Sequence, residues 1–259
     1  MNSIRSQSRL TNVIVLLFLL LGVTNVADCA LPSTLKVCSR NETKINQCII
    51  DAVEHIRTNL AKGDFGPDFN VPKLEPLFIE QVKMQNGKDL QAVVNKVNVS
   101  GCSAFKIERM QSKPMNLSFD LVVSIPKLNF TGKYTLKMKL LLLNLQGKGD
   151  INGTLTNVRL SARIRGYTET IDGKNYVRFH RLGIRLKVDD GRFQLDNLFN
   201  GDPVLGKVGN QVINENSRIF LDELLPGLEK NLSKLFTAIA NNLLKNATID
   251  EMFPEKVAD

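Results

Sequence analysis

The pattern of apolar and polar positions divides the chain into three regions of different periodicity. Between residues 42 and 62, apolar residues recur every three to four positions, which is typical of an amphipathic helix that Gly63 can end. Between about residues 77 and 195 they recur every second position, which predicts strands with one dry and one wet face. From residue 207 to 246 the helical period returns. Pro226-Gly227 is expected to kink this last helix or divide it in two.

Two details refine the strand region. The apolar positions are odd-numbered from Leu117 to Ile125 and even-numbered from Leu128 to Leu142, so the alternation slips by one at Pro126. Asp172-Gly173 is a hairpin signal between two alternating segments. Both features are typical of an antiparallel sheet.

The order of a helix, a long series of strands and a long helix predicts an α+β fold. The apolar stripe of the last helix is wide for a helix on the surface, so we expect a strongly curved antiparallel sheet to wrap around it. No internal repeat, low-complexity tract or linker divides the chain. Residues 31–259 are therefore expected to form one domain.

The stretch DNLFNGDPVLG, residues 196–206, joins the strand region to the last helix. Asn200-Gly201 tolerates positive φ, and Asp202-Pro203 favours an extended turn before a helix. The segment is therefore predicted to be a structural joint. Three of its apolar residues are expected to pack against the end of the core: Leu198, Phe199 and Leu205.

Residues 1–30 have the composition of a secretory signal peptide. Arg5 and Arg9 precede the apolar run from Val13 to Val23, and small residues follow at Ala27 to Ala30. The run is shorter than the roughly 20 residues that a membrane-spanning helix needs, which disfavours the alternative of a retained anchor. The remaining chain is expected to be secreted and extracellular.

The cysteines agree with an oxidising compartment. Cys29 leaves with the signal peptide or lies at its edge. Cys38 and Cys48 are close in sequence, and one of them opens a helical pattern, so they are the expected disulfide. Cys102 is then unpaired, either as a buried free thiol, which we favour, or as an intermolecular link.

Seven Asn-x-Ser/Thr triplets are potential glycosylation sites. Asn231 and Asn246 are set aside because the helical pattern places them in the last helix, near its apolar side. The expected glycosylation sites are Asn41, Asn98, Asn116, Asn129 and Asn152.

Positive charge is concentrated in the strand region of this chain, whose net charge is +8. Residues 131–188 hold twelve Lys and Arg against three acidic residues. These cations alternate with the apolar positions, so the sheet has an apolar face and a basic face. The basic face is a solvated outer surface or, alternatively, a contact for an anionic membrane or an acidic protein partner. A nucleic-acid partner is not expected, because the chain is secreted and lacks Trp.

Catalytic and metal-binding patterns are weak. The two histidines, His55 and His180, are not accompanied by a Gly-x-Ser-x-Gly motif, and both are expected to be surface or structural residues. The acidic residues between Asp189 and Asp202 miss the spacing of a calcium loop. No metal and no cofactor are therefore predicted, and a secreted hydrolase remains the weakest of three functional hypotheses.

The apolar face of the strands is the strongest functional signal. Long rows of large apolar side chains, with no polar constellation suited to catalysis, indicate a carrier that encloses an apolar ligand in an internal tunnel. Tyr134 places a hydroxyl on this face and is a candidate polar anchor. The residues expected to line the tunnel are Phe119, Leu121, Val123, Phe130, Tyr134, Leu136, Met138, Leu140, Leu160, Ile184, Phe220, Leu224, Leu228 and Phe236.

A set of short motifs resembles the insect takeout and juvenile hormone-binding protein family over nearly all of the predicted mature chain. They are Cys38 to Cys48-Ile49, Pro76 to Ile79, Gly132 to Leu136, Gly147 to Gly149, Asn197 to Gly201 with Leu205-Gly206, and Ile249 to Pro254. The resemblance implies a curved sheet around a long C-terminal helix, as in tubular lipid-binding proteins, and an N-terminal disulfide between Cys38 and Cys48. No cysteine follows Cys102, whereas hormone-binding members carry a second disulfide, so the resemblance favours the takeout-like branch.

The leading functional hypothesis is thus a secreted, monomeric, non-enzymatic carrier of a small hydrophobic ligand, either terpenoid hormone-like or fatty-acid-like. The alternative is a membrane-surface lipid-transfer or signalling partner that uses the basic face of the sheet.

Overall fold

The computed structural model describes residues 31–256 of the 259-residue chain, so the expected signal peptide at residues 1–30 lies outside the described residues. The helices are α2 (Ile45–His55), α3 (Arg57–Lys62), α4 (Pro203–Glu215), α5 (Ser217–Leu243) and α6 (Ile249–Met252), with 3-10 turns η1 (Cys102–Ala104), η2 (Pro114–Asn116) and η3 (Phe199–Gly201). The strands are β1 (Leu77–Asn86), β2 (Leu90–Ser100), β3 (Lys106–Lys113), β4 (Ser118–Leu140), β5 (Leu143–Ile171), β6 (Lys174–Phe179), β7 (Gly183–Lys187) and β8 (Asp190–Leu195).

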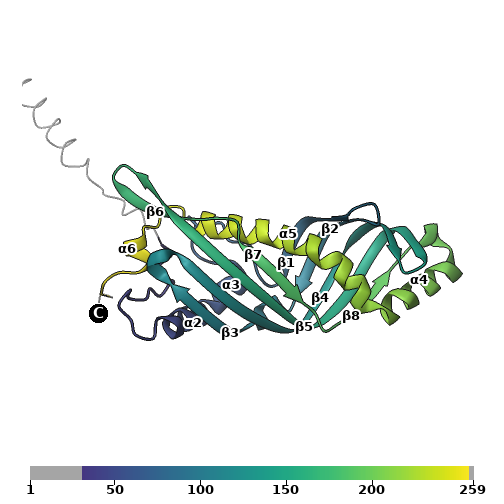
Figure 1. Ribbon diagram of the computed structural model, residues 1–259, viewed down its shortest axis with the longest axis horizontal. Helices are drawn as coiled ribbons and strands as arrows, with labels where there is room; N and C mark the ends of the chain where they lie inside the picture. Colours follow the sequence, from purple (N-terminus) through teal and green to yellow (C-terminus); the bar gives the residue numbers. More distant parts are fainter. Residues whose placement is uncertain (1–30, 257–259) are drawn as a thin grey trace, which may run out of the picture.

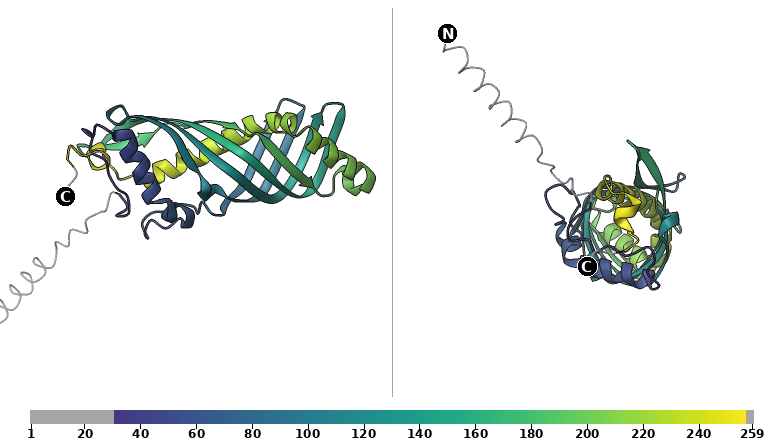
Figure 2. Two further views of the ribbon diagram at one scale, coloured as in Figure 1. Left: turned by 90° about the horizontal axis from the view of Figure 1, so that it is seen from below. Right: turned by 90° about the vertical axis from the view of Figure 1, so that its left-hand side faces the viewer.

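All strand pairings are antiparallel, and the order is β1-β2-β4-β5-β6. β3 pairs with β4 beyond the end of β2, and β7 and β8 pair with successive parts of β5. The sheet curls along its length into an elongated trough that α5 fills (Figure 1), and the end-on view shows α5 within the ring of strands (Figure 2). The predicted α+β fold, with a curved antiparallel sheet around a long C-terminal helix, is confirmed.

Polar side chains of α5 and α4 form hydrogen bonds with backbone groups at the free edge of the sheet. Glu229, Ser233, Thr237 and Asn241 are four residues apart, so they lie on one side of α5. They bond backbone groups of Leu186, Leu182 and Phe179. On α4, Asn210 and Asn214 each accept and donate one bond with the backbone of Leu195 and Phe193, respectively. The helices thereby satisfy edge groups that a further strand would otherwise pair, and they close the trough.

The last helical region begins and divides earlier than its pattern predicts. Asp202 caps α4, because its side chain accepts hydrogen bonds from the backbone of Val204 and Leu205, and Pro203 occupies the first turn. The break falls at Asn216, between α4 and α5. Pro226 lies inside α5 and does not divide it, and a Cβ on Gly227 would lie 2.8 Å from Met84. Gly227 thus lets α5 approach β1 closely.

The joint at residues 196–206 is a turn between β8 and α4, as predicted. Asn200 and Gly201 have φ of 59° and 89°, respectively. Leu198 is buried and Phe199 packs against the same core cluster. The expectation for Leu205 is wrong, since it is 48% exposed: it lies in the first turns of α4, where Val204 and Val208 are exposed as well.

Two apolar clusters lie toward opposite ends of the trough. The larger includes Leu140, Leu145, Leu198 and Ile213 near α4. The smaller joins Phe119 and Phe179 to the C-terminal Phe253, among others. Within the described residues, no helix is both long enough and apolar enough to cross a membrane.

Candidate functional site

An internal cavity of about 430 Å³ lies between the curled sheet and α5. Of the described residues, those that line it are apolar, with the single exception of the Cys102 thiol. The wall takes side chains from most strands of the sheet and from α5. Its size falls within the roughly 300–1,000 Å³ that is usual for small-molecule sites.

The strand alternation turns one row of side chains of β4 and β5 toward this cavity. Leu121, Val123 and Ile125 line it before Pro126, and Leu128 and Phe130 line it afterwards. The predicted slip in alternation at Pro126 is thus confirmed. On α5, four-residue spacing aligns the side chains that close the cavity from inside the trough: Phe220, Leu224, Leu228, Leu232 and Phe236.

The structure places nine of the fourteen expected tunnel residues on the cavity wall. Five come from the strands and four from α5: Leu121, Val123, Phe130, Leu160, Ile184, Phe220, Leu224, Leu228 and Phe236. That they contact a ligand stays a prediction.

The other five expected residues lie outside the cavity, in the packed clusters at its ends. Leu136, Met138 and Leu140 belong to the cluster near α4. Phe119 stacks on Phe253 in the opposite cluster, with ring centroids 6.0 Å apart. Alternation reports which face of the sheet a residue occupies, whereas position along the trough decides whether it meets the empty space.

Tyr134 does not place its hydroxyl in the cavity, as the prediction of a polar anchor requires. It is buried, and its hydroxyl donates a 2.6 Å hydrogen bond to the backbone carbonyl of Asp196. Burial, together with the Asp196 carboxylate, raises the pKa of Tyr134 to about 12. The hydroxyl therefore fastens β4 to the segment after β8 and does not project into the cavity.

Sequence reasoning missed the part of the wall that β1 and β2 form. Leu77, Ile79, Val94, Val97 and Val99 line the cavity. Their alternation in β2 is interrupted by a bulge near Lys96, which has φ of 51°. The apolar pattern of residues 77–99 is visible in the sequence, and allowing for one such slip would have identified these residues.

A short turn places the buried Cys102 against the cavity. The Glu75 carboxylate accepts hydrogen bonds from the backbone of Gly101 and Ser103 and from the Ser103 hydroxyl. Burial alone would raise the pKa of Glu75, but these hydrogen bonds outweigh it and lower that pKa. Burial and the nearby Glu75 charge raise the pKa of the Cys102 thiol to about 11. The thiol is free and uncharged at neutral pH, as expected for a buried cysteine.

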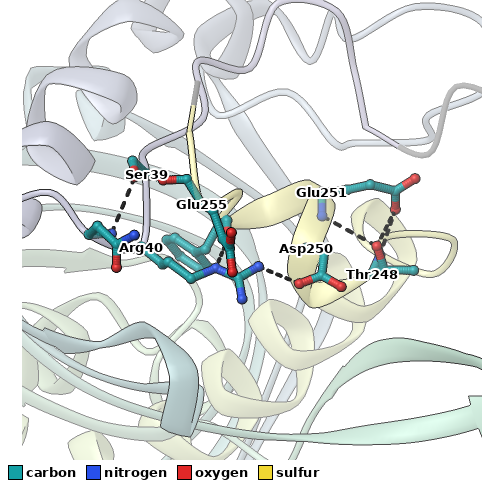
Figure 3. A network of polar contacts seen from close by, with 8 residues as sticks. Ser39, Arg40, Thr248, Asp250, Glu251 and Glu255 are labelled. Atoms are coloured by element: carbon teal, nitrogen blue, oxygen red, sulfur yellow. Dashed lines mark hydrogen bonds and ion pairs between the residues drawn. The ribbon is translucent and has the colours of Figure 1, made fainter. Parts of the chain in front are cut away.

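The N-terminal and C-terminal segments are fastened together across one end of the trough. Figure 3 shows Arg40 and Ser39 beside the C-terminal residues Asp250 and Glu255. Arg40 pairs with Asp250 and donates to the Phe253 carbonyl at 2.9 Å, and the Ser39 hydroxyl donates to the Glu255 carbonyl. We call these residues the terminal clasp. The clasp holds Phe253 in the cluster that the cavity residues Leu160, Ile164 and Phe236 also join.

Acidic partners offset much of the basic outer face of the sheet. Asp120 pairs with Arg163 and Arg165. Hydrogen bonding from Arg165, the largest effect, outweighs burial and lowers the pKa of Asp120. Glu108 pairs with Arg159, and Asp150 with Lys133. The sequence count overstates the charge of this face because Asp120 and Glu108 lie outside residues 131–188 and come beside them only in the folded sheet.

The two histidines do not form a catalytic arrangement within the described residues. Both are exposed, and the imidazole of His180 stacks on Tyr167 with centroids 4.7 Å apart. Neither imidazole makes a hydrogen bond to a Ser or to a carboxylate in that part of the chain. The described residues also contain no group of three or more His, Cys, Asp or Glu positioned to hold a metal ion.

The disulfide between Cys38 and Cys48 is present, as predicted. The five expected glycosylation sites, Asn41, Asn98, Asn116, Asn129 and Asn152, are exposed, and their use stays a prediction. The half-buried Asn231 donates to the carbonyls of Lys83 and Gly227. Asn246 is exposed and follows the end of α5, so its expected place inside the helix is wrong.

Comparison with known proteins agrees with this architecture. A family model described as haemolymph juvenile hormone binding protein matches residues 15–254. The circadian clock-controlled protein daywake of Drosophila yakuba is 26% identical over 235 residues, covering 86% of this chain and 88% of that protein. Daywake of Drosophila melanogaster is 24% identical over 238 residues, covering 87% and 89%. The crystal structure of Takeout 1 from Epiphyas postvittana matches 85% of this chain and 100% of that one, with a TM-score of 0.71 and 20% identity.

Proposed function

The chain belongs to the haemolymph juvenile hormone binding protein family, a family of ligand-binding carriers, and we propose that it is a secreted carrier that reversibly binds a small hydrophobic ligand in the internal cavity. The observation that carries this proposal is a cavity of about 430 Å³ with an apolar wall. Residues 1–30 act as the signal peptide in this proposal, and residues 31–259 are the carrier domain.

Burial of an apolar ligand against this wall supplies part of the free energy that micromolar binding needs. Burying about 300 Å² of apolar ligand surface at ~25 cal/mol/Å² contributes roughly 7 kcal/mol before the cost of association. Micromolar binding needs about 8 kcal/mol, so good shape complementarity must supply the rest. No chemical step is required of the wall, and the protein releases its ligand unchanged.

The wall also favours a particular ligand chemistry. Of the described lining residues, none carries a charge, and the Cys102 thiol is a weak hydrogen-bond donor. A buried carboxylate without a partner would pay a large desolvation cost. Neutral terpenoid-like esters or alcohols therefore suit the cavity better than ionised fatty acids, whose head group would have to remain in water.

Displacement of the fluorescent apolar probe N-phenyl-1-naphthylamine tests this proposal. We expect the probe to bind with enhanced emission, and a neutral terpenoid ester to displace it at least about tenfold more tightly than the free acid of the same chain, a difference of about 1.4 kcal/mol. Absence of probe binding would contradict the carrier function. Tighter binding of the acid would contradict the neutral-ligand preference alone.

A further inference from the structure

One end of the molecule carries exposed apolar side chains that neither the cavity nor the core uses. Five of the ten large apolar residues that are exposed among the described residues lie here, on the β4–β5 turn and in the first turns of α4. Leu142 is 95% exposed and Val204 is 69% exposed. We define the distal tip as Leu141, Leu142, Val204, Leu205 and Val208, together with the exposed lysines Lys88, Lys137, Lys139 and Lys207.

These segments are neighbours in space, and Figures 1 and 2 show α4 and the adjacent hairpins at the same end of the trough. The backbone N–H of Lys139 donates to the Asp89 carbonyl at 2.8 Å, which holds the β1–β2 turn beside the end of β4. α4 lies against β5 at Gly209, where an added Cβ would be in ordinary van der Waals contact with the Leu145 side chain, at 3.7 Å. Leu142 is three residues from Leu145, which is about 10 Å along a strand.

The apolar residues of the distal tip do not belong to a partly exposed edge of the hydrophobic core. α4 buries its opposite side, where Gly209 and Ile213 lie, so Val204 and Val208 point away from the protein. Leu141 and Leu142 form the tight turn between two long strands. Exposed apolar residues gathered in one place mark an interaction site more often than scattered ones do.

The surrounding charge indicates the chemistry of the partner. The segments 86–90, 137–144 and 202–208 hold four lysines against Asp89 and Asp202. The Asp202 carboxylate is engaged by the backbone N–H groups of Val204 and Leu205 at the start of α4. Apolar side chains on projecting turns, flanked by lysines, match the boundary between acyl chains and anionic head groups at a lipid surface.

We propose that the distal tip docks the protein on a phospholipid surface that carries anionic head groups. Leu142 and Val204 enter the boundary between head groups and acyl chains, and the lysines contact the head groups. This surface goes beyond the carrier function. It includes Lys137 and Lys139 from the outer face of the sheet, but not the part of that face where Asp120, Glu108 and Asp150 pair with basic residues. The packed cluster around Leu140, Leu145 and Ile213 separates the tip from the cavity, so docking does not depend on a bound ligand.

Co-sedimentation with vesicles tests the proposal. The probes are vesicles of phosphatidylcholine alone and of phosphatidylcholine mixed with phosphatidylserine. We expect binding to the mixed vesicles that is at least about tenfold stronger than to the neutral ones and that weakens as salt is raised. The double variant Leu142→Ser/Val204→Ser should reduce binding at least about tenfold without lowering stability, because both residues are exposed.

The matched control is Phe78→Ser/Ile171→Ser, which removes two exposed apolar residues outside the tip and should leave binding unchanged. The triple variant Lys88→Gln/Lys139→Gln/Lys207→Gln should lose the preference for phosphatidylserine. The proposal is overturned if the wild type binds neither vesicle, or if the tip and control variants lose binding equally. It is also overturned if sedimentation shows that the tip joins two copies of this chain and no vesicle binding occurs.

Discussion

Pro126 of β4 lies opposite Asn157 of β5, next to the pair formed by Ile125 and Val158. Asn157 has φ of 50°, in the left-handed region, and Pro126 has no N–H to donate to the pairing. The alternation of both strands slips by one at this point, so the apolar side chains on either side of it face the cavity. A single irregularity shared by two long strands thus keeps the cavity wall continuous.

The first prediction concerns Asn157. A β-branched residue resists the left-handed conformation, so Asn157→Val should lower the free energy of unfolding by about 1–2 kcal/mol. Asn157→Gly adopts the same conformation without strain and should have a smaller effect. Urea denaturation measures both values. Equal losses in the two variants would show that positive φ at this position does not matter.

The slip shows how far the sequence predicts this fold. In β4 it is visible, because large apolar residues stand on both sides of Pro126. In β5 it is concealed, because Gly153 interrupts the apolar row just before Asn157. Strand periodicity shows which residues lie on each face of the sheet, so the sequence alone predicted which residues form the apolar face.

Position along the trough is a different kind of information. Leu136 and Leu160 have the same pattern in the sequence, yet Leu136 lies in the packed cluster near α4 and Leu160 lies on the cavity wall. Which of them meets empty space depends on how α4 and α5 fill the curled sheet, and that is a property of the tertiary packing. The role of the polar row of α5, from Glu229 to Asn241, could not be predicted from the sequence either. It depends on the strand edge whose backbone groups these side chains hydrogen-bond.

The second prediction uses two neighbours on opposite faces of β5. Leu160 lines the cavity, whereas Ser161 is exposed. Leu160→Asp should abolish binding of the apolar probe because it buries a charge without a partner, and Ser161→Asp should leave binding within about twofold. Fluorescence titration measures both. Equal effects would show that the cavity is not where the probe binds.

Because Leu160→Asp can also impair folding, Leu160→Phe provides a second comparison. It fills part of the cavity with apolar atoms, and we expect weaker probe binding in a protein that still unfolds cooperatively. Unchanged affinity in Leu160→Phe would contradict the assignment of the cavity as the binding site.

The third prediction follows from the Cys102 thiol. Its pKa is raised from an ordinary value of 9.0 to about 11 in the folded protein, chiefly by burial. The folded state therefore holds the thiol proton more tightly than the unfolded chain does. This contribution to stability is fully present below about pH 9 and is lost as the pH rises through 11.

Urea denaturation across this pH window should accordingly show a steeper loss of stability in the wild type than in Cys102→Ala. The comparison is between the slopes with pH, because the substitution also changes packing. Parallel profiles would mean that the thiol is not shielded from water as the structure places it.

The fourth prediction concerns the terminal clasp. Arg40→Ala removes the ion pair with Asp250 and leaves the Phe253 carbonyl without its side-chain donor, which should cost about 1–3 kcal/mol. Because Phe253 belongs to the cluster that adjoins the cavity, we expect the apolar probe to dissociate several-fold faster. Stopped-flow fluorescence measures this rate.

Asp250→Asn is the control for the clasp. The Asp250 side chain is 76% exposed, so weakening its ion pair should cost less than about 1 kcal/mol and leave the dissociation rate nearly unchanged. If both variants release the probe at the wild-type rate, the end of the trough closed by the clasp is not on the path of the ligand.

Native mass spectrometry of the protein purified from its natural source tests the central claim, that the apolar cavity holds a small hydrophobic ligand. We predict a species whose mass exceeds that of the protein alone by one small molecule, which is released intact by organic solvent and is depleted in Leu160→Phe. A protein that carries no such molecule, and takes up neither terpenoids nor fatty acids on incubation, would contradict the claim.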